Sequence, residues 1–337
     1  MFVPVVSSSG KPLMPCHPAR SRELLRSGRA VRRFDRGLFY IRLTDRTDGE
    51  TQPIAVGIDP GSKKEAFSVK SESHTYLNIQ TDAVTWVSWN VKTRREMRRT
   101  RRGRKTPYRK CRPNRGVKNR IPPSTRARWG WKLRICGWLS RYYPVTIFAV
   151  EDIKAGSRKG QRRWNCSFSP LEVGKNWFYA ELGKMAPVRT YQGYEKKALR
   201  DHWGLKKTRN KMSDRFEAHC VDSWVLANAE MGGHSSPDDT GIMYIVPLRF
   251  HRRQLHRLQP KNGERKSYGG TISLGIKRGT WVRHPKHGVV YIGGHMNGRL
   301  SLHSLQDGKR LCQNARPKDC AALTRCSWRV RIAHTLL

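Results

Sequence analysis

Three acidic residues and one histidine have the types and positions that metal-assisted phosphodiester chemistry requires. Asp59 ends the apolar run IAVGID, Glu151 ends the apolar run TIFAVE, and Asp222 follows His219 by three residues in the segment HCVD. Hydrolysis with two metal ions needs carboxylates from different elements that hold hard cations about 4 Å apart. If the two runs are neighbouring strands and a helix carrying Asp222 crosses their ends, the three carboxylates can bind Mg²⁺, as two ions, and His219 can serve as a base or orient water.

Each of these residues also has a simpler explanation. Asp59 can be a turn residue after a strand, and Asp152 is a possible substitute for Glu151. Asp214 and Glu217 compete with Asp222 but fall on another face of the expected helix, which begins with Ser213 as its N-cap. The loop GIDPGS also resembles a phosphate-binding loop of actin-like ATPases, but the second Gly-rich loop that those proteins need is not found.

A strongly basic segment lies between the Asp59 and Glu151 runs. From Lys92 to Arg120, 15 of 29 residues are Lys or Arg, and Glu96 is the one acid. A helix is expected from about Thr81 until Pro107 ends it. Arginines on every side of a helix prevent it from lying on a sheet, so it must project toward nucleic-acid phosphates. The expected contact residues are Arg94, Arg95, Arg98, Arg99, Arg101, Arg102, Arg104, Lys105 and Arg109.

The overall composition also indicates a polyanionic partner. The chain has 337 residues, with 68 Lys and Arg against 25 Asp and Glu, a formal charge of +43. Such an excess disfavours a compact chain unless a polyanion neutralises it. No apolar run is long enough to span a bilayer, and no signal peptide is recognised, so a cytoplasmic protein without a membrane partner is expected. Cys312, Cys320 and Cys326 have no common zinc spacing and are interpreted as structural.

The order of expected elements predicts an α/β fold with three parts. Residues 1–50 form a small N-terminal module, and residues 51–235 form the main domain, into which the basic segment at about 88–125 is inserted. Three strands, a helix, a strand, a helix, a strand and a helix are the order of an RNase H-like sheet. Short Gly-punctuated strands from 241 to 337 predict a small β-barrel-like domain.

These residues resemble the transposon-encoded, RNA-guided IscB/IsrB group of nucleases. The segment GKPLMP (Lys11 to Pro15) resembles that group's PLMP module, and GIDPGS, VED and HCVD resemble its three split RuvC motifs. The basic segment resembles its bridge helix, and residues 241–337 resemble its module that reads a target-adjacent motif. Only about 70 residues separate Glu151 from His219, with no His-Asn-His pattern, so the resemblance is to IsrB, which lacks the HNH nuclease.

The resemblance implies a function and roles for the site residues. Asp59, Glu151 and Asp222 would be metal ligands, with His219 beside them. A structured guide RNA would pair with target double-stranded DNA, and a monomeric protein would nick the displaced strand in a Mg²⁺-dependent reaction. Two other classes stay open, namely a guide-independent RuvC-like nuclease such as a junction resolvase, and a non-catalytic RNA-binding protein.

Overall fold

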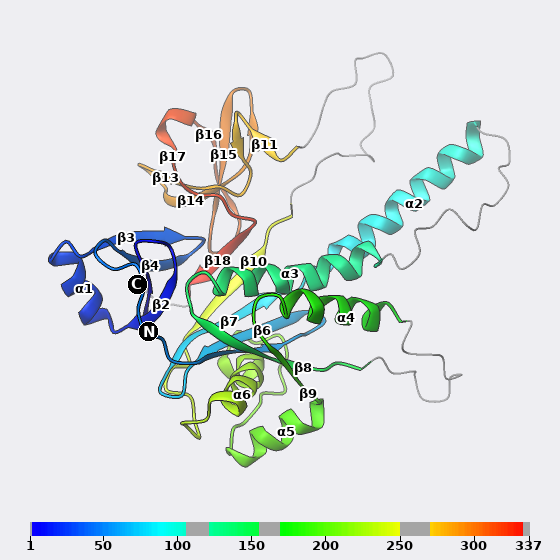
Figure 1. Cartoon of the computed structure of the whole chain (residues 1–337). Coiled ribbons are helices and arrows are strands. Elements are labelled where there is room, and N and C mark those ends of the chain that lie inside the picture. The colour runs from blue at the N-terminus through cyan, green and yellow to red at the C-terminus, as the bar shows by residue number, and fades with distance from the viewer. Residues whose placement is uncertain (1, 106–120, 155–168, 250–269, 333–337) are drawn as a thin grey trace, which may run out of the picture.

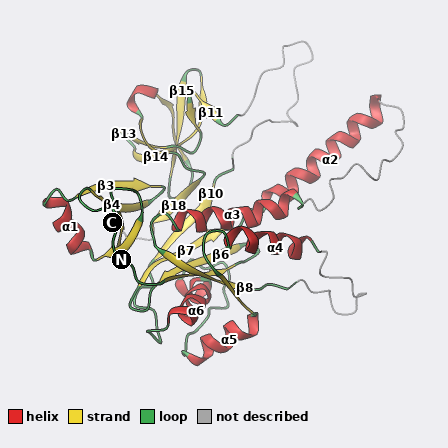
Figure 2. Ribbon diagram, viewed as in Figure 1, coloured by secondary structure: helices red, strands yellow, loops and turns green. Residues whose placement is uncertain are grey.

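The protein is a mixed α/β chain, as predicted, in which a large sheet carries helices on both faces (Figures 1 and 2). The computed structural model describes residues 2–105, 121–154, 169–249 and 270–332. Four sheets occur within these ranges, with seven, five, four and two strands. No helix in the same ranges is long and apolar enough to cross a membrane.

The seven-stranded sheet has the strand order β18-β10-β7-β6-β5-β8-β9. Strands β5, β6 and β7 form an antiparallel meander, while β8 runs parallel to β5 and β9 runs parallel to β8. Three antiparallel strands followed along the chain by parallel strands is the element order that the sequence predicts. The strands are β5 (Ile54–Asp59), β6 (Lys64–Lys70), β7 (Thr75–Asp82), β8 (Val145–Glu151), β9 (Val188–Tyr191), β10 (Ile242–Pro247) and β18 (Trp328–Ile332).

Helices on the two faces bury the central strands. Every residue of β5 is buried, because Ile54, Val56 and Ile58 contact the cluster that includes α3, while the alternate residues face α6. Figure 1 shows α3 and α4 on one side of the sheet and α5 and α6 on the other. The helices are α1 (Pro18–Arg26), α2 (Trp86–Lys105), α3 (Pro123–Leu139), α4 (Pro170–Leu182), α5 (Gly193–His202) and α6 (Cys220–Met231).

The edge of the large sheet differs from the sequence expectation. Both β10 and β18 lie in this sheet, although the sequence places them in a separate β region that begins near residue 241. Strand β10 runs parallel to β7, and β18 pairs antiparallel with β10. The sequence of a short alternating strand does not show which sheet the strand joins. Strand β18 joins the large sheet because its residues Trp328 and Val330 pack in the main core.

The N-terminal module is a four-stranded sheet with its own small core. Its order is β2-β1-β4-β3, and α1 covers the cluster formed by residues such as Val5, Leu24 and Ile41. The segment GKPLMP supplies strand β2. Strand β3 has no clear sequence signal, because four of its six residues are exposed and three are charged. The strands are β1 (Val3–Val6), β2 (Pro12–Cys16), β3 (Ala30–Asp35) and β4 (Leu38–Leu43).

The C-terminal β region contains a five-stranded sheet and a short hairpin. The sheet order is β16-β15-β14-β13-β17, with β11 and β12 as the hairpin. Cys312 and Cys320 lie in the apolar cluster of this sheet, whereas Cys326 lies in the main core, so the three cysteines do not share one site. The strands are β11 (Ile272–Ser273), β12 (Ile276–Lys277), β13 (Trp281–His284), β14 (Gly288–Met296), β15 (Arg299–Ser304), β16 (Arg310–Ala315) and β17 (Ala321–Thr324).

Gly57 allows α6 to pack directly on β5. A Cβ atom at this position would lie 1.8 Å from the carbonyl oxygen of Ser223 and 2.7 Å from the backbone nitrogen of Ala227. Both neighbours are backbone atoms, so they cannot move aside as a side chain would. The glycine of the run IAVGID therefore sets how closely the helix that carries Asp222 approaches the strand that carries Asp59.

We expect Gly57→Ala to lower the free energy of unfolding by about 3 kcal/mol or more, because the added methyl overpacks a rigid backbone contact. Gly103→Ala is the matched control, since Gly103 lies on the exposed part of α2 with nothing within 4 Å of an added Cβ. That change should stabilise the helix by about 0.5–1 kcal/mol. Urea unfolding of both variants measures the difference, and equal midpoints would contradict the role given to Gly57.

Candidate active site and nucleic-acid interface

Strand register brings Asp59 and Glu151 to the same edge of the sheet. Strands β5 and β8 are parallel neighbours in which Ile58 pairs with Val150, so the residues that follow end their strands side by side. Glu151 also lies next to the first residue of α5, because a Cβ on Gly193 would be 3.3 Å from Glu151 Oε1. A helix N-terminus carries partial positive charge and favours a carboxylate there.

Helix α6 supplies Asp222, which lies in its first turn and is fully buried. The helix is shorter than expected. Ser213 does not cap it; a 3₁₀ turn at Phe216–Ala218 precedes it, and His219 is its N-cap residue. His219 therefore sits at the helix start rather than on the helix face. The structure nevertheless brings Asp59, Glu151, Asp222 and His219 together.

The three carboxylates meet at the ammonium group of Lys196, a residue of α5. Lys196 Nζ lies 2.8 Å from Asp59 Oδ1, 2.8 Å from Glu151 Oε2 and 2.9 Å from Asp222 Oδ2. The Lys196 side chain is 7% exposed, so water screens these contacts little. The four residues come from β5, β8, α5 and α6, which are distant in sequence and adjacent in space.

Two further basic residues contact Asp222. Arg200 lies one turn after Lys196 on α5, and its Nη1 is 2.7 Å from Asp222 Oδ1. Lys207 forms an ion pair with Asp222 Oδ2. Three carboxylates are thus surrounded by three cations, and Asp222 contacts all of the cations.

The close charges displace the pKa values of the site. Burial acts to raise the pKa of Asp59, but the charge of Lys196 outweighs it and holds that pKa well below its usual range. Burial, together with the charge of Asp59, raises the pKa of Glu151. Burial acts to lower the pKa of Lys196, but the charges of Asp59, Asp222 and Glu151 outweigh it and hold that pKa above its usual range. Paired acids with divergent pKa values are common at functional sites.

The carboxylate oxygens fit Mg²⁺ by chemistry, because hard divalent cations prefer oxygen ligands. Asp59, Glu151 and Asp222 already converge on one cation from three elements. In this structure, Lys196 Nζ lies where the oxygens of the three carboxylates converge. Within the part of the chain that the structure describes, no group of three His, Cys, Asp or Glu side chains is placed to hold a metal ion.

The competing carboxylates are used elsewhere. Asp152 lies 2.6 Å from Lys175 Nζ and accepts hydrogen bonds from Tyr179 and Gln192, so it faces α4 rather than Lys196. Asp214 is exposed and pairs with Arg331 at 2.8 Å. The strand alternation that turns Glu151 inward turns Asp152 away.

His219 has one ring nitrogen available to the site. Its Nε2 lies 2.9 Å from the carbonyl oxygen of Lys211, which can only accept, so Nε2 donates this hydrogen bond. Its Nδ1 lies 3.6 Å from Asp59 Oδ2 and is the nitrogen that faces the carboxylates. The Lys211 contact therefore fixes both the ring orientation and which nitrogen can exchange a proton.

Sequence patterns alone do not single out Lys196, Arg200 or Lys207 as site residues. Lys196 and Arg200 are four residues apart on one helix, so they share a face. In a chain with 68 Lys and Arg, such a pair does not stand out. The adjacent Lys197 is exposed, so the sequence alone does not show that Lys196 is the buried lysine of the pair.

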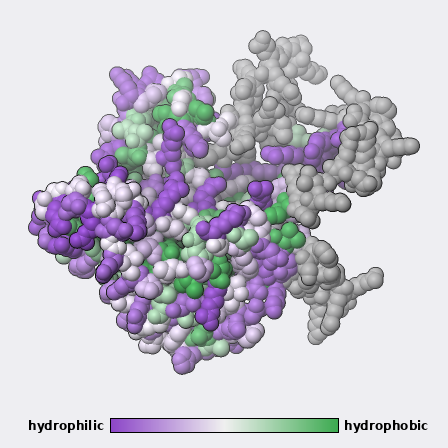
Figure 3. Space-filling view, in the orientation of Figure 1, coloured by the Kyte–Doolittle hydropathy of each residue, from purple (hydrophilic) through white to green (hydrophobic). Residues whose placement is uncertain are grey.

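The arginine helix α2 extends away from the sheet, as expected for a helix charged on every side (Figure 1). Its arginines with described side chains are exposed and form no ion pair with any residue in the described ranges; they are Arg94, Arg95, Arg98, Arg99 and Arg102. On the face shown in Figure 3, the visible stretch of α2 is hydrophilic. The predicted residues Arg101, Arg104 and Lys105 belong to α2, but their side chains lie outside the description, as does Arg109 entirely.

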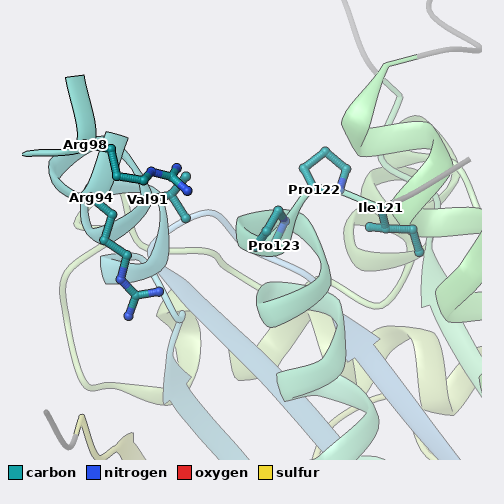
Figure 4. Close-up of a pocket in the computed structure, with 6 residues that line it drawn as sticks. All are labelled: Val91, Arg94, Arg98, Ile121, Pro122 and Pro123. Carbon is teal, nitrogen blue, oxygen red and sulfur yellow. The ribbon is translucent and has the colours of Figure 1, made fainter. Parts of the chain in front are cut away.

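A cleft of about 420 Å³ separates α2 from the start of α3 (Figure 4). One wall carries Arg94 and Arg98 beside Val91. The other wall is apolar and is formed by Ile121, Pro122 and Pro123. A cleft with guanidinium groups on one side and apolar surface on the other suits a nucleotide, because arginine binds phosphate while an apolar wall accepts a base.

A known protein family matches about the first half of the chain. Residues 3–164 match the RRXRR protein family. Residues 98–102 read Arg-Arg-Thr-Arg-Arg, which is the pattern in that family's name, and they lie on α2. The matched span includes Asp59 and Glu151, whereas Lys196, His219 and Asp222 lie beyond it.

Two solved structures of Thermus thermophilus RuvC are similar to part of the chain. RuvC in complex with a Holliday junction substrate is 15% identical, with a TM-score of 0.28, covering 54% of this chain and 98% of that one. The other RuvC structure is 15% identical, with a TM-score of 0.25, covering 53% and 97%. No curated protein matches the chain.

Proposed function

We propose that this protein is a guide-RNA-directed DNA endonuclease that nicks the non-target strand of a duplex. One observation carries the proposal. Between Asp59 and Glu151, which meet at one cation, the chain leaves the sheet as an exposed arginine helix. The candidate cutting site and the candidate nucleic-acid grip are thus parts of one folded unit.

The residues at the strand ends have distinct roles in this mechanism. Asp59, Glu151 and Asp222 would hold Mg²⁺, which when bound activates the attacking water and neutralises charge on the phosphate. His219 presents Nδ1 to the site, so it can accept a proton from the water or position it. Arg200 and Lys207 neutralise Asp222 and add positive potential toward the approaching phosphate.

Different parts of the chain bind different parts of the nucleic acid. The bridge helix α2 contacts the guide RNA through its exposed arginines. The PLMP module at 1–50 contacts the guide RNA as well. The split RuvC domain spans 51–235 and carries the cutting site. The β region within 241–337 reads a short duplex motif beside the target, and base pairing with the guide supplies sequence specificity. The protein acts as a monomer within a ribonucleoprotein.

A single nuclease site predicts a nick rather than a double-strand break. Glu151 and His219 are only about 70 residues apart, and the described residues between them form α4, β9, α5 and a 3₁₀ turn. The interval contains no His-Asn-His pattern, so no second nuclease of the HNH type is recognised there.

The test uses purified protein with any structured RNA that copurifies with it, and a supercoiled plasmid that carries a sequence matching that RNA next to a randomised flank. We expect conversion to open circles, dependent on both RNA and Mg²⁺, with sequencing of the nick placing it on the strand that does not pair with the guide. Cutting of both strands would overturn the nickase assignment.

The control reactions separate the remaining classes. A plasmid without the match should stay supercoiled. Cutting without RNA would favour a guide-independent nuclease, and RNA binding without cutting under every metal condition would favour a non-catalytic RNA-binding protein.

A further inference from the structure

Lys196 stands at the centre of the candidate metal site and is itself buried. Its side chain is 7% exposed, and its Nζ contacts Asp59, Glu151 and Asp222 at 2.8, 2.8 and 2.9 Å. Full burial of a lysine is rare unless it is paired. With Arg200 and Lys207, the three carboxylates are matched by three basic side chains, so the site is electrically balanced by the protein's own residues.

The ammonium group and a metal ion cannot share this position. A magnesium ion binds oxygen at about 2.0–2.1 Å and prefers octahedral geometry, so it needs the same carboxylate oxygens that Nζ contacts. Lys196 therefore has to leave before a metal ion is bound by these oxygens.

We propose that Lys196 is an internal cation that fills the metal position in the free protein and is displaced when a divalent cation binds. The inference rests on the proposed function, because it takes Asp59, Glu151 and Asp222 as the metal ligands. Lys196 lies near the start of α5, between the exposed residues Gly193 and Lys197, so its flexible four-carbon stem has solvent within reach.

The contacts also indicate which carboxylates the displacement frees. When Lys196 leaves, Asp222 keeps Arg200 and Lys207 as partners. Glu151 keeps no lysine or arginine within ion-pair distance among the described residues, and Asp59 keeps only the more distant charge of Lys207 and the His219 ring. The first metal ion is therefore bound mainly by Asp59 and Glu151, and Asp222 joins it less tightly.

The first experiment measures Mn²⁺ binding to the full chain by isothermal titration calorimetry. Lys196→Gln removes the competing charge and is expected to bind Mn²⁺ about tenfold more tightly or better than the wild type. Lys197→Gln is the control, because Lys197 is the adjacent exposed lysine and its loss should leave the affinity unchanged. Without metal, Lys196→Gln should melt at a lower temperature than the control, and Mn²⁺ should restore most of the difference.

A second measurement uses the wild type alone and does not depend on the folding of a variant. Lysines are acetylated briefly with and without saturating Mg²⁺, and the modified sites are quantified by mass spectrometry. Lys196 is expected to be protected without Mg²⁺ and labelled with it, while labelling of the exposed Lys197 stays constant.

The outcomes separate this inference from the proposed function. If wild type and Lys196→Gln bind Mn²⁺ equally, or if Lys196 stays protected at saturating Mg²⁺, the displacement is refuted although the metal site stands. If neither protein binds Mn²⁺, or if Asp59→Asn binds Mn²⁺ as tightly as the wild type, the metal site itself is wrong. Tighter binding by Lys196→Gln with exposure of wild-type Lys196 supports the displacement.

Discussion

Replacing Asp59 with alanine is expected to lower the rate of guide-dependent nicking by about a thousandfold or more. Loss of a carboxylate that holds the metal removes several kcal/mol of transition-state stabilisation, which corresponds to that factor. The fold should survive, because the buried Lys196 ammonium keeps Glu151 and Asp222 as partners. Single-turnover cutting of a matched plasmid, measured beside RNA affinity, tests both statements.

Asp214→Ala is the matched control for Asp59→Ala. Asp214 is an exposed aspartate that precedes the same helix α6 but pairs with Arg331 outside the site. An exposed pair contributes little, so nicking and RNA affinity should match the wild type. Persistent nicking by Asp59→Ala would remove Asp59 from the metal site, and loss of RNA binding by the same variant would show that the change disturbs more than chemistry.

Replacing Arg94, Arg95, Arg98 and Arg99 together with glutamine is expected to weaken RNA binding and to flatten its dependence on salt. These side chains are exposed on α2 and form no ion pair with described residues, so they are free to contact phosphates. Four lost phosphate contacts lower the slope of log affinity against log salt by about 3. Filter binding from 50 to 300 mM salt measures the slope.

The same four positions replaced with lysine provide the control. Lysine keeps each charge but loses the planar guanidinium fork. If the helix acts through charge alone, the lysine variant keeps the wild-type slope, and if the cleft of Figure 4 holds a nucleotide through Arg94 and Arg98, its affinity falls while the slope stays. An unchanged slope in the glutamine variant would exclude α2 as an RNA contact.

The sequence predicted the order of the central strands because each had a strong local signal. The runs that end at Asp59 and Glu151 are continuous and apolar, as strands covered on both faces must be. Helix α3 has an equally clear local signal, because Trp131, Ile135 and Trp138 recur at helical spacing and all three are buried. These signals are local, so they can be read without knowing which strand lies beside which.

Features set by long-range contacts could not be predicted in this way. Nothing near Lys196 indicates that its ammonium lies between carboxylates from three other elements. The start of α6 was misplaced because Ser213 followed by acidic residues looks like a helix cap, whereas its hydroxyl accepts a hydrogen bond from Arg215 in a preceding turn. The strand β3 was missed because its outward residues are charged.

The pairing of β10 with β18 brings the two ends of the C-terminal β region side by side, so this region could be exchanged as a unit. The chain leaves the large sheet after Pro247 and returns at Trp328, and these two residues face each other across the same antiparallel pair. A foreign domain whose termini lie close together can be joined at this point without breaking the sheet. A graft would have to replace Trp281, which packs in the main core and donates a hydrogen bond to the Trp328 carbonyl. If this region reads flanking DNA as proposed, exchange at these two residues is expected to transfer that recognition while leaving Asp59, Glu151 and Asp222 in place.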